Sequence, residues 1–273
     1  MKKHIVLIIS GVLLAALAIV FLAQSSSQQS DSSNASRNIY GFAGSGCNVA
    51  TLDVGGFLSS EESTDTPVSS WDVSQAIRNM DFNDKKALVV FLDSDGGTPA
   101  AADEIATALG EVHVPTVAYV RGDALSGGYW IAASTDHIVA LKTALIGNVG
   151  VNSSFLNQTE SDKQSGVTYE QITSGRYKDA GSIDKPLSVA DREFLQGVND
   201  DLFQIFTAVV TKGRGFTTQQ FAAVADGKFY VASKALKLGL IDEIGDINTV
   251  ENYISSKTGT NLGDINLCPF PQY

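Results

Sequence analysis

Apolar residues along the chain form short runs that alternate with stretches of helical spacing. The runs at 87–92 and 114–120 are almost entirely apolar, which is typical of strands buried on both faces of a parallel sheet. Similar runs at 49–54 and 138–141 predict two more strands. Between the runs, apolar residues recur every three or four positions, which indicates helices. Strands that alternate with helices predict right-handed crossovers and an α/β fold with a parallel sheet and flanking helices.

The second half of the chain is richer in helical patterns. A long stretch, 189–212, carries apolar residues at helical spacing, and shorter stretches of the same kind follow at 219–224, 232–238 and 249–257. Gly239 comes directly after the 232–238 stretch, at the position where a glycine commonly ends a helix. We therefore expect one long helix and three short ones in this half.

Two glycine-rich turns follow neighbouring predicted strands. Residues 93–97 read Asp-Ser-Asp-Gly-Gly, and residues 124–128 read Ala-Leu-Ser-Gly-Gly. In parallel sheets, ligands lie at the carboxyl ends of the strands, so backbone N–H groups of both turns can point into one crevice. Ser126 precedes a short apolar helix, where a serine acts either as an N-cap or as a displayed nucleophile. This stretch alone favours neither interpretation.

An apolar segment lies near the amino terminus. Lys2 and Lys3 precede it, and residues 5–23 carry no charge and are numerous enough to span a bilayer. Because a cleaved signal peptide usually has a shorter apolar region, we expect residues 1–23 to form an uncleaved signal anchor, with cleavage as the alternative. The two lysines keep the amino terminus cytoplasmic, so the rest of the chain is expected outside the cytoplasm.

The rest of the chain divides by composition. Residues 24–46 are rich in Ser and Gln and predict a flexible linker. Residues 47–258 are expected to form one globular domain, and residues 259–273 a C-terminal tail. Cys47 and Cys268 flank that domain, and in an oxidising compartment they can form a disulfide. The sequence does not fix the distance between them, so this pairing stays open.

Charge and composition exclude several classes of function. The net charge is −11, and no basic cluster occurs beyond the amino terminus, so we do not expect nucleic-acid binding. The three histidines and two cysteines are too few for a metal site with several His or Cys ligands, and we predict no metal or other cofactor. Acid–base chemistry must therefore come mainly from carboxylates, lysine or tyrosine.

A nucleophilic serine needs a base that takes its proton. A histidine is a poor fit, because His137 is the only one after Ser126 and starts a predicted strand; we interpret it and His113 as strand-edge residues. A lysine can serve where desolvation lowers the pKa of its ammonium group. Lys178 lies between two glycine-containing turns, a context that also suits a solvated loop lysine. The lysines after the serine are Lys142, Lys163, Lys178, Lys185, Lys212, Lys228, Lys234, Lys237 and Lys257.

Five stretches of the chain form an ordered set of motifs. The stretches are 93–97, 124–130, 146–151, 174–179 and 225–245. Together they resemble the signal peptide peptidase A family of Ser-Lys peptidases, which belongs to the ClpP/crotonase-like superfamily. The resemblance covers residues 48 to 256. Each motif is weak alone, and their order and spacing make the resemblance specific.

The resemblance implies a ClpP/crotonase-like fold and a membrane-anchored serine endopeptidase of the short, single-domain form. By position, Ser126 is expected to be the nucleophile and Lys178 the general base. The resemblance also implies an oxyanion hole formed by the backbone N–H groups of Gly97 and Gly127, with Gly96 beside them. It further implies peptide substrates, such as signal peptides or membrane-proximal polypeptides, and a homo-oligomer whose subunits line the substrate cleft.

Three residues depart from the family pattern. Asp95 replaces a proline before the two glycines, Leu125 replaces a small residue before the serine, and Asn148 replaces a serine that helps to orient the lysine. These departures motivate the alternative of a catalytically inert relative that binds peptides or a partner protein. An acyl-CoA enzyme of the crotonase type is a third interpretation, although such enzymes lack the serine–lysine pair. We expect apolar residues near Leu125 and Tyr129 to line the cleft.

Overall fold

The computed structural model of the protein describes residues 46–60 and 68–269. The chain divides into two compact units, Met1–Gly41 and Phe42–Tyr273, and the described residues all belong to the second. The expected membrane anchor at 1–23 therefore lies outside the described residues. Within the described part, no helix is both long enough and apolar enough to span a bilayer.

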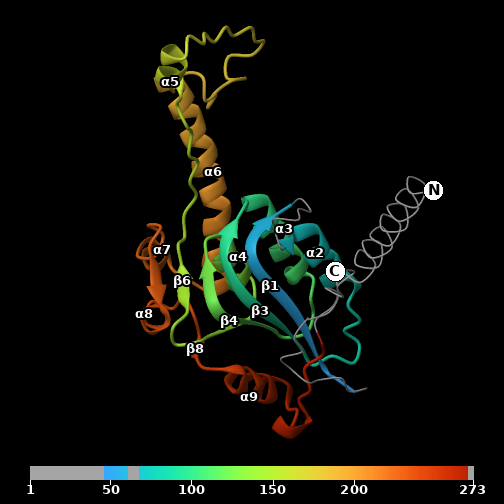
Figure 1. The fold of residues 1–273 in the computed structure, drawn as a ribbon. Coiled ribbons are helices and arrows are strands. Elements are labelled where there is room, and N and C mark those ends of the chain that lie inside the picture. Colours follow the sequence, from blue (N-terminus) through green and yellow to red (C-terminus); the bar gives the residue numbers. More distant parts are fainter. Residues whose placement is uncertain (1–45, 61–67, 270–273) are drawn as a thin grey trace, which may run out of the picture. The chain divides into compact units, whose positions relative to one another are not determined.

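The described residues form a sheet of eight strands. The main path runs β2-β1-β3-β4-β5-β8, while β6 pairs with the end of β4 and with β7 (Figure 1). Every pair is parallel except β6 with β7. The predicted α/β fold with a parallel sheet is thus confirmed. The strands are β1 (Val49–Ser59), β2 (Val68–Ser69), β3 (Ala87–Gly97), β4 (Thr116–Leu125), β5 (His137–Ala140), β6 (Leu145–Gly147), β7 (Phe229–Val231) and β8 (Glu243–Ile244).

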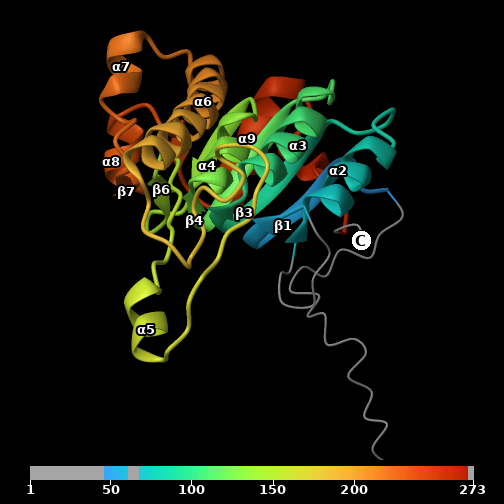
Figure 2. The same ribbon diagram turned by 90° about the horizontal axis from the view of Figure 1, so that it is seen from above.

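Helices pack on both faces of the sheet (Figure 2). Alternate residues of β3, such as Leu88 and Val90, join the core beneath α2, α3 and α4. On the opposite face, Tyr253 of α9 stacks on His137, with ring centroids 3.8 Å apart. The helices are α2 (Ser70–Asn79), α3 (Pro99–Gly110), α4 (Gly127–Ala133), α5 (Thr159–Gln164), α6 (Val189–Arg214), α7 (Thr218–Ala222), α8 (Ala232–Lys237) and α9 (Ile247–Thr258), with a short 3₁₀ turn at Leu262–Asp264.

The strands that carry the two glycine turns are longer than their apolar runs. β3 continues to Gly97 and β4 to Leu125, so both turns lie within the sheet or directly after it. The register shifts after Leu92, where the Asp93 side chain accepts a hydrogen bond from the amide of Asp123, 3.0 Å away, and pairing resumes between Ser94 and Ala124. Polar residues that the sequence pattern assigned to loops therefore extend the sheet at its carboxyl end.

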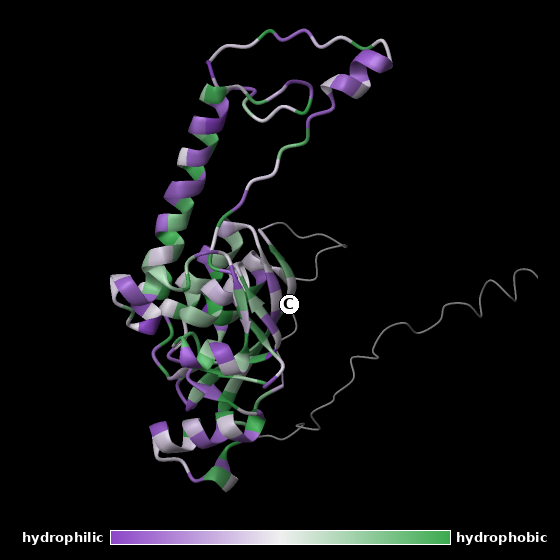
Figure 3. Ribbon diagram, turned by 90° about the vertical axis from the view of Figure 1, so that its left-hand side faces the viewer, coloured by the Kyte–Doolittle hydropathy of each residue, from purple (hydrophilic) through white to green (hydrophobic). Residues whose placement is uncertain are grey.

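Helix α6 has two different halves. Its C-terminal half packs on α4, where Phe206 stacks on Trp130 with ring centroids 4.9 Å apart. Its N-terminal half extends beyond the sheet and carries the segment between β6 and α6, including α5 (Figure 1). Apolar residues recur along that half (Figure 3), yet the side chains of Phe194 and Val198 are exposed. The helical pattern was right, but part of its apolar face stays exposed in the described part of the chain.

The start of β1 is joined to the C-terminal segment. Cys47 and Cys268 form a disulfide, with Cα atoms 5.0 Å apart. Beside it, the amide of Val49 donates to Asn266 and the amide of Cys268 donates to Val49. The last described residues therefore extend the sheet along β1, and the pairing that the sequence left open is present.

Candidate active site

Ser126 lies at the sharp turn from β4 into α4. It occupies the N-cap position with φ 51° and ψ −119°, and its side chain makes no capping hydrogen bond. A serine backbone in this region is strained by about 1–3 kcal/mol. Its amide donates to the carbonyl of Gly147, 2.9 Å away, and its carbonyl accepts from Trp130. The hydroxyl of Ser126 is thus not used as a helix cap, and hydrogen bonds of its own amide and carbonyl groups hold its backbone in a strained conformation.

The two glycine turns are in contact. A Cβ on Gly96 would lie 2.8 Å from both Ser126 Cβ and Gly127 N, and φ of Gly96 is +104°. A Cβ on Gly127 would lie 3.3 Å from the amide nitrogen of Gly97. Only glycine fits at 96, because any side chain there would push into the serine turn. The turns meet at one point because β3 and β4 are parallel neighbours.

The amides of these turns differ in their partners. The N–H of Gly96 donates to Ser94 Oγ, 3.1 Å away. That hydrogen bond fixes the turn and removes Gly96 as a donor to a ligand. The amides of Gly97 and Gly127 lie at the contact between the two turns and remain the candidates for an oxyanion hole.

Asn148 lies next to the carbonyl that holds Ser126. Its φ is 54°, and its Nδ2 donates to the carbonyl of Gly227, 2.7 Å away. Its backbone amide donates to Lys228. Within the described part of the chain its side-chain oxygen accepts no hydrogen bond, so that oxygen could accept one from a lysine ammonium group.

Lys178 lies in a turn before α6 and is exposed. Within the described part of the chain, no hydrogen bond or ion pair joins its ammonium group to another side chain. Its neighbour Tyr177 stacks on Phe194 of α6. Along α6, Phe194 lies 12 residues, or about 18 Å, from Phe206, which stacks on Trp130 of α4, the helix that follows Ser126. Within one chain, the structure does not bring this lysine within hydrogen-bond reach of the serine.

Carboxylates gather beside the serine turn. Burial raises the pKa of Asp123, and the charges of Asp95 and Asp93 together with a side-chain hydrogen bond to Asp95 raise it further. Asp95, one of the three departures from the family pattern, therefore has Asp123 as its partner. Among the described residues, no group of three or more His, Cys, Asp or Glu side chains is arranged to hold a metal ion.

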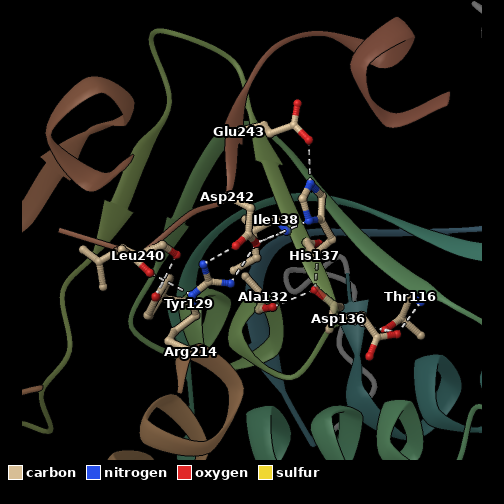
Figure 4. Close-up of polar contacts among 12 residues, drawn as sticks. Thr116, Tyr129, Ala132, Asp136, His137, Ile138, Arg214, Leu240, Asp242 and Glu243 are labelled. Carbon is tan, nitrogen blue, oxygen red and sulfur yellow. Dashed lines mark hydrogen bonds and ion pairs between the residues drawn. The ribbon is translucent and has the colours of Figure 1, made fainter. Parts of the chain in front are cut away.

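A polar network behind α4 was not anticipated from the sequence (Figure 4). Tyr129 donates to the carbonyl of Leu240, 2.9 Å away, and is fully buried, so Tyr129 itself is not part of the cleft wall that we expect near it. Arg214 of α6 binds both oxygens of Asp242 at 2.9 and 2.6 Å. The Asp242 carboxylate also accepts from the amide of Ile138. The network fixes α4 and α6 to the sheet, and its acidic member lies within the last family motif.

The histidines lie away from the serine. His137 starts β5, and its register partner on β4 is Val117, at the opposite end of that strand from Ser126. Its ring contacts Glu243 at 3.0 Å, and His113 lies before β4 against Phe82. Their positions agree with strand-edge roles, and neither is placed to act as a base for the serine.

Comparison with known proteins gives the family. The sequence pattern of Peptidase family S49 matches residues 109–260. MJ0651 of Methanocaldococcus jannaschii, which is named as a protease, is 32% identical over 162 residues, covering 59% of this chain and 52% of that protein. Slr0021 of Synechocystis sp., also named as a protease, is 30% identical over 197 residues, covering 71% of each chain. This chain thus spans about half the length of the archaeal relative.

A solved structure shares the fold. It is a mutant of the 1510-N membrane-bound stomatin-specific protease, with a TM-score of 0.53 and 16% identity, covering 84% of this chain and 100% of that one. At this identity the similarity concerns the fold alone. The sequence matches carry the family assignment, and they agree with the resemblance to the signal peptide peptidase A family. The chain belongs to peptidase family S49.

Proposed function

We propose that this protein is a membrane-anchored serine endopeptidase that cleaves signal peptides or membrane-proximal polypeptides. The observation that carries the proposal is the strained, uncapped Ser126 beside a second glycine turn, in a chain of family S49. Ser126 is the nucleophile and Lys178 the general base. The amides of Gly97 and Gly127 form the oxyanion hole.

The reaction follows from these roles. Lys178 Nζ takes the hydroxyl proton while Ser126 Oγ attacks the peptide carbonyl, which breaks its π bond and forms a tetrahedral oxyanion. The two backbone amides stabilise that charge by about 3–4 kcal/mol per donor. Lys178 then gives the proton to the leaving amine, and the serine ester remains. Water then attacks the ester carbonyl while its proton passes to Lys178 Nζ. As the bond between the carbonyl carbon and Ser126 Oγ breaks, Lys178 gives that proton to Ser126 Oγ, which restores the serine and the neutral lysine.

The lysine must reach the serine of another copy for this chemistry to occur. The segment that carries it is unusually apolar for a surface, because Ile172 is 99% and Leu156 76% exposed, and Val189 at the start of α6 is 75% exposed. Exposed apolar groups of this size in one region mark an interaction surface. We therefore propose a homo-oligomer in which the segment before α6 of one subunit packs beside Ser126 of its neighbour.

Mixed oligomers test the dyad and its sharing together. The full-length chain is purified in detergent as wild type, as Ser126→Ala, as Lys178→Ala, and from cells that co-express the two variants. Casein cleavage is then measured for each preparation. Each variant alone is expected to be inactive. Random mixing should restore about a quarter of the wild-type activity, since half of the serines and half of the lysines are intact. Full activity of both single variants would remove the dyad, and an inactive mixture would remove the sharing.

The membrane location is a separate part of the proposal. The apolar residues 5–23 are proposed to anchor the chain, with the peptidase domain outside the cytoplasm. The Cys47–Cys268 disulfide supports this, because disulfides persist in oxidising compartments. Sequencing the amino terminus of the mature protein tests the anchor: a start near Gln24 would mean that the segment is removed.

A catalytically inert peptide-binding protein is the second candidate. It is favoured by the isolated position of Lys178 and by Asp95 beside the glycine turn. A fluorophosphonate probe separates the two candidates, because it labels only an activated serine. Labelling at Ser126, absent from Lys178→Ala, supports the peptidase. Binding of a casein peptide without labelling or cleavage supports the inert protein.

A further inference from the structure

The turn that carries Lys178 is held on both sides of the lysine. Before it, Tyr177 stacks on Phe194 with ring centroids 4.8 Å apart and an interplanar angle of 22°. After it, one oxygen of Asp179 accepts a hydrogen bond from Lys185 Nζ at 2.7 Å. The first contact is made by a residue of α6 itself, and the second by a residue four positions before α6, while the Lys178 side chain remains exposed. The backbone of the turn is therefore fixed although its lysine is not.

Lys185 connects the turn to the start of α6. Its ammonium group lies 2.7 Å from Asp179 and 3.6 Å from Asp191, whose side chains are only 11% and 8% exposed. Asp191 is the N3 residue of α6 and forms a capping box with Ser188. One cation thus bridges two carboxylates, one from the lysine turn and one from the helix cap.

The electrostatics of this bridge oppose its release. The hydrogen bond to Asp179 raises the pKa of Lys185, so its ammonium group stays charged. The same hydrogen bond lowers the pKa of Asp179. Without the cation, two carboxylates whose side chains are only 11% and 8% exposed would lose a shared partner, which weakens the contact between the turn and the helix.

We propose that Lys185 is a positioning residue for the reaction: its contacts to Asp179 and Asp191 hold the Lys178 turn on the first turn of α6, in the orientation that presents Lys178 to a serine. This inference rests on the proposed function. Among the lysines that the sequence offers as bases, Lys185 thus acts through another lysine and touches no substrate. Lys163, whose Glu160 partner lies 3.8 Å away on an exposed surface, has no such role and serves as the matched control.

The experiment compares Lys185→Met, Lys185→Arg and Lys163→Met in the full-length chain. Trypsin cleavage after Arg176 and Lys178 reports the order of the turn, and the Lys185–Pro186 bond is not a trypsin site, so the Met variant removes no competing cleavage. In Lys185→Met, cleavage is expected to rise at least tenfold and casein kcat to fall about tenfold, with KM within twofold. Lys185→Arg, which can also bridge two carboxylates, should restore both to within threefold. Lys163→Met should match the wild type in kcat and in cleavage at these two bonds.

The outcomes separate this inference from the proposed function. Wild-type values of trypsin cleavage and kcat in Lys185→Met would overturn the inference. Faster cleavage with unchanged kcat would overturn it too, since Lys185 would then hold the turn without positioning the base. A rise in KM alone would also overturn it. Equal casein activity in wild type and Ser126→Ala would instead overturn the proposed function, and the trypsin result would still report whether Lys185 holds the turn.

Discussion

Breaking the Cys47–Cys268 disulfide should destabilise the fold strongly without removing its secondary structure. The two cysteines are 221 residues apart, so the bond closes a loop that contains almost the whole described domain. The chain-entropy treatment of such a loop gives about 5 kcal/mol at 25 °C, and removal of native disulfides costs about 2–5 kcal/mol. The hydrogen bonds between Val49 and the segment 266–268 remain in the reduced chain, so the native pairing is weakened rather than abolished.

Urea unfolding followed by circular dichroism measures this effect with an internal control. The chain has two cysteines, so a reductant has one target, and the Cys47→Ser, Cys268→Ser double variant should be insensitive to it. We expect the reduced wild type and the oxidised double variant to unfold at the same lower urea concentration. A loss below about 1 kcal/mol would refute the reasoning, because the loop would then constrain the unfolded chain far less than its length requires.

Three further predictions concern the site and its support. Gly96→Ala would place its Cβ 2.8 Å from Gly127 N, so kcat should fall about 100-fold, whereas Gly110→Ala, with open space around it, should behave as wild type. Burial raises the pKa of Asp242, but the hydrogen bond and charge of Arg214 outweigh burial and hold the pKa below 3.8. The ionised carboxylate therefore stabilises the fold fully above pH 3.8, and this stabilisation is lost as the pH falls through the pKa of the folded state. In acid unfolding experiments, Asp242→Asn should lose this part of the pH dependence of stability. The raised pKa of Asp123 has the opposite effect on stability. The contribution of this carboxyl group to folding stability is present below pH 3.8 and is lost as the pH rises through the pKa of the folded state. Thermal unfolding should therefore find Asp123→Asn more stable than wild type at pH 7 and no more stable at pH 3.

The long strands could be predicted from the sequence because buried parallel strands are apolar on both faces. The run 87–92 lies in β3 and the run 138–141 largely in β5. The short strands β6, β7 and β8 could not be predicted, since segments of two or three residues carry no periodicity and form only because a neighbouring strand supplies hydrogen bonds. Tertiary pairing, rather than local pattern, decides such elements.

The site divides in the same way. The order of the strands was enough to place the two glycine turns together, and the structure has them in contact. The sequence indicated an apolar helix at Tyr129 but could not show the hydrogen-bond partner of its hydroxyl, because the position of Leu240 depends on the packing of a distant segment. The role of Lys185 was hidden for a similar reason: its two carboxylate partners lie in different local structures, and neither spacing is a motif.

Helix α6 accounts for the separation of the two proposed catalytic residues. Its 26 residues span about 39 Å, and a continuous helix of this length does not fold back on itself. Its C-terminal end is fixed beside the serine helix by Arg214 and Asp242, while its N-terminal end holds the Lys178 turn through Lys185. Under the proposed function, a base fixed to the far end of such a helix acts on a serine that another molecule supplies. The exposed apolar residues along the same half of α6 are where that molecule would pack. The mixed-oligomer experiment therefore tests whether the two residues are shared between molecules, and the Lys185 experiment tests how the N-terminal end of α6 holds the base.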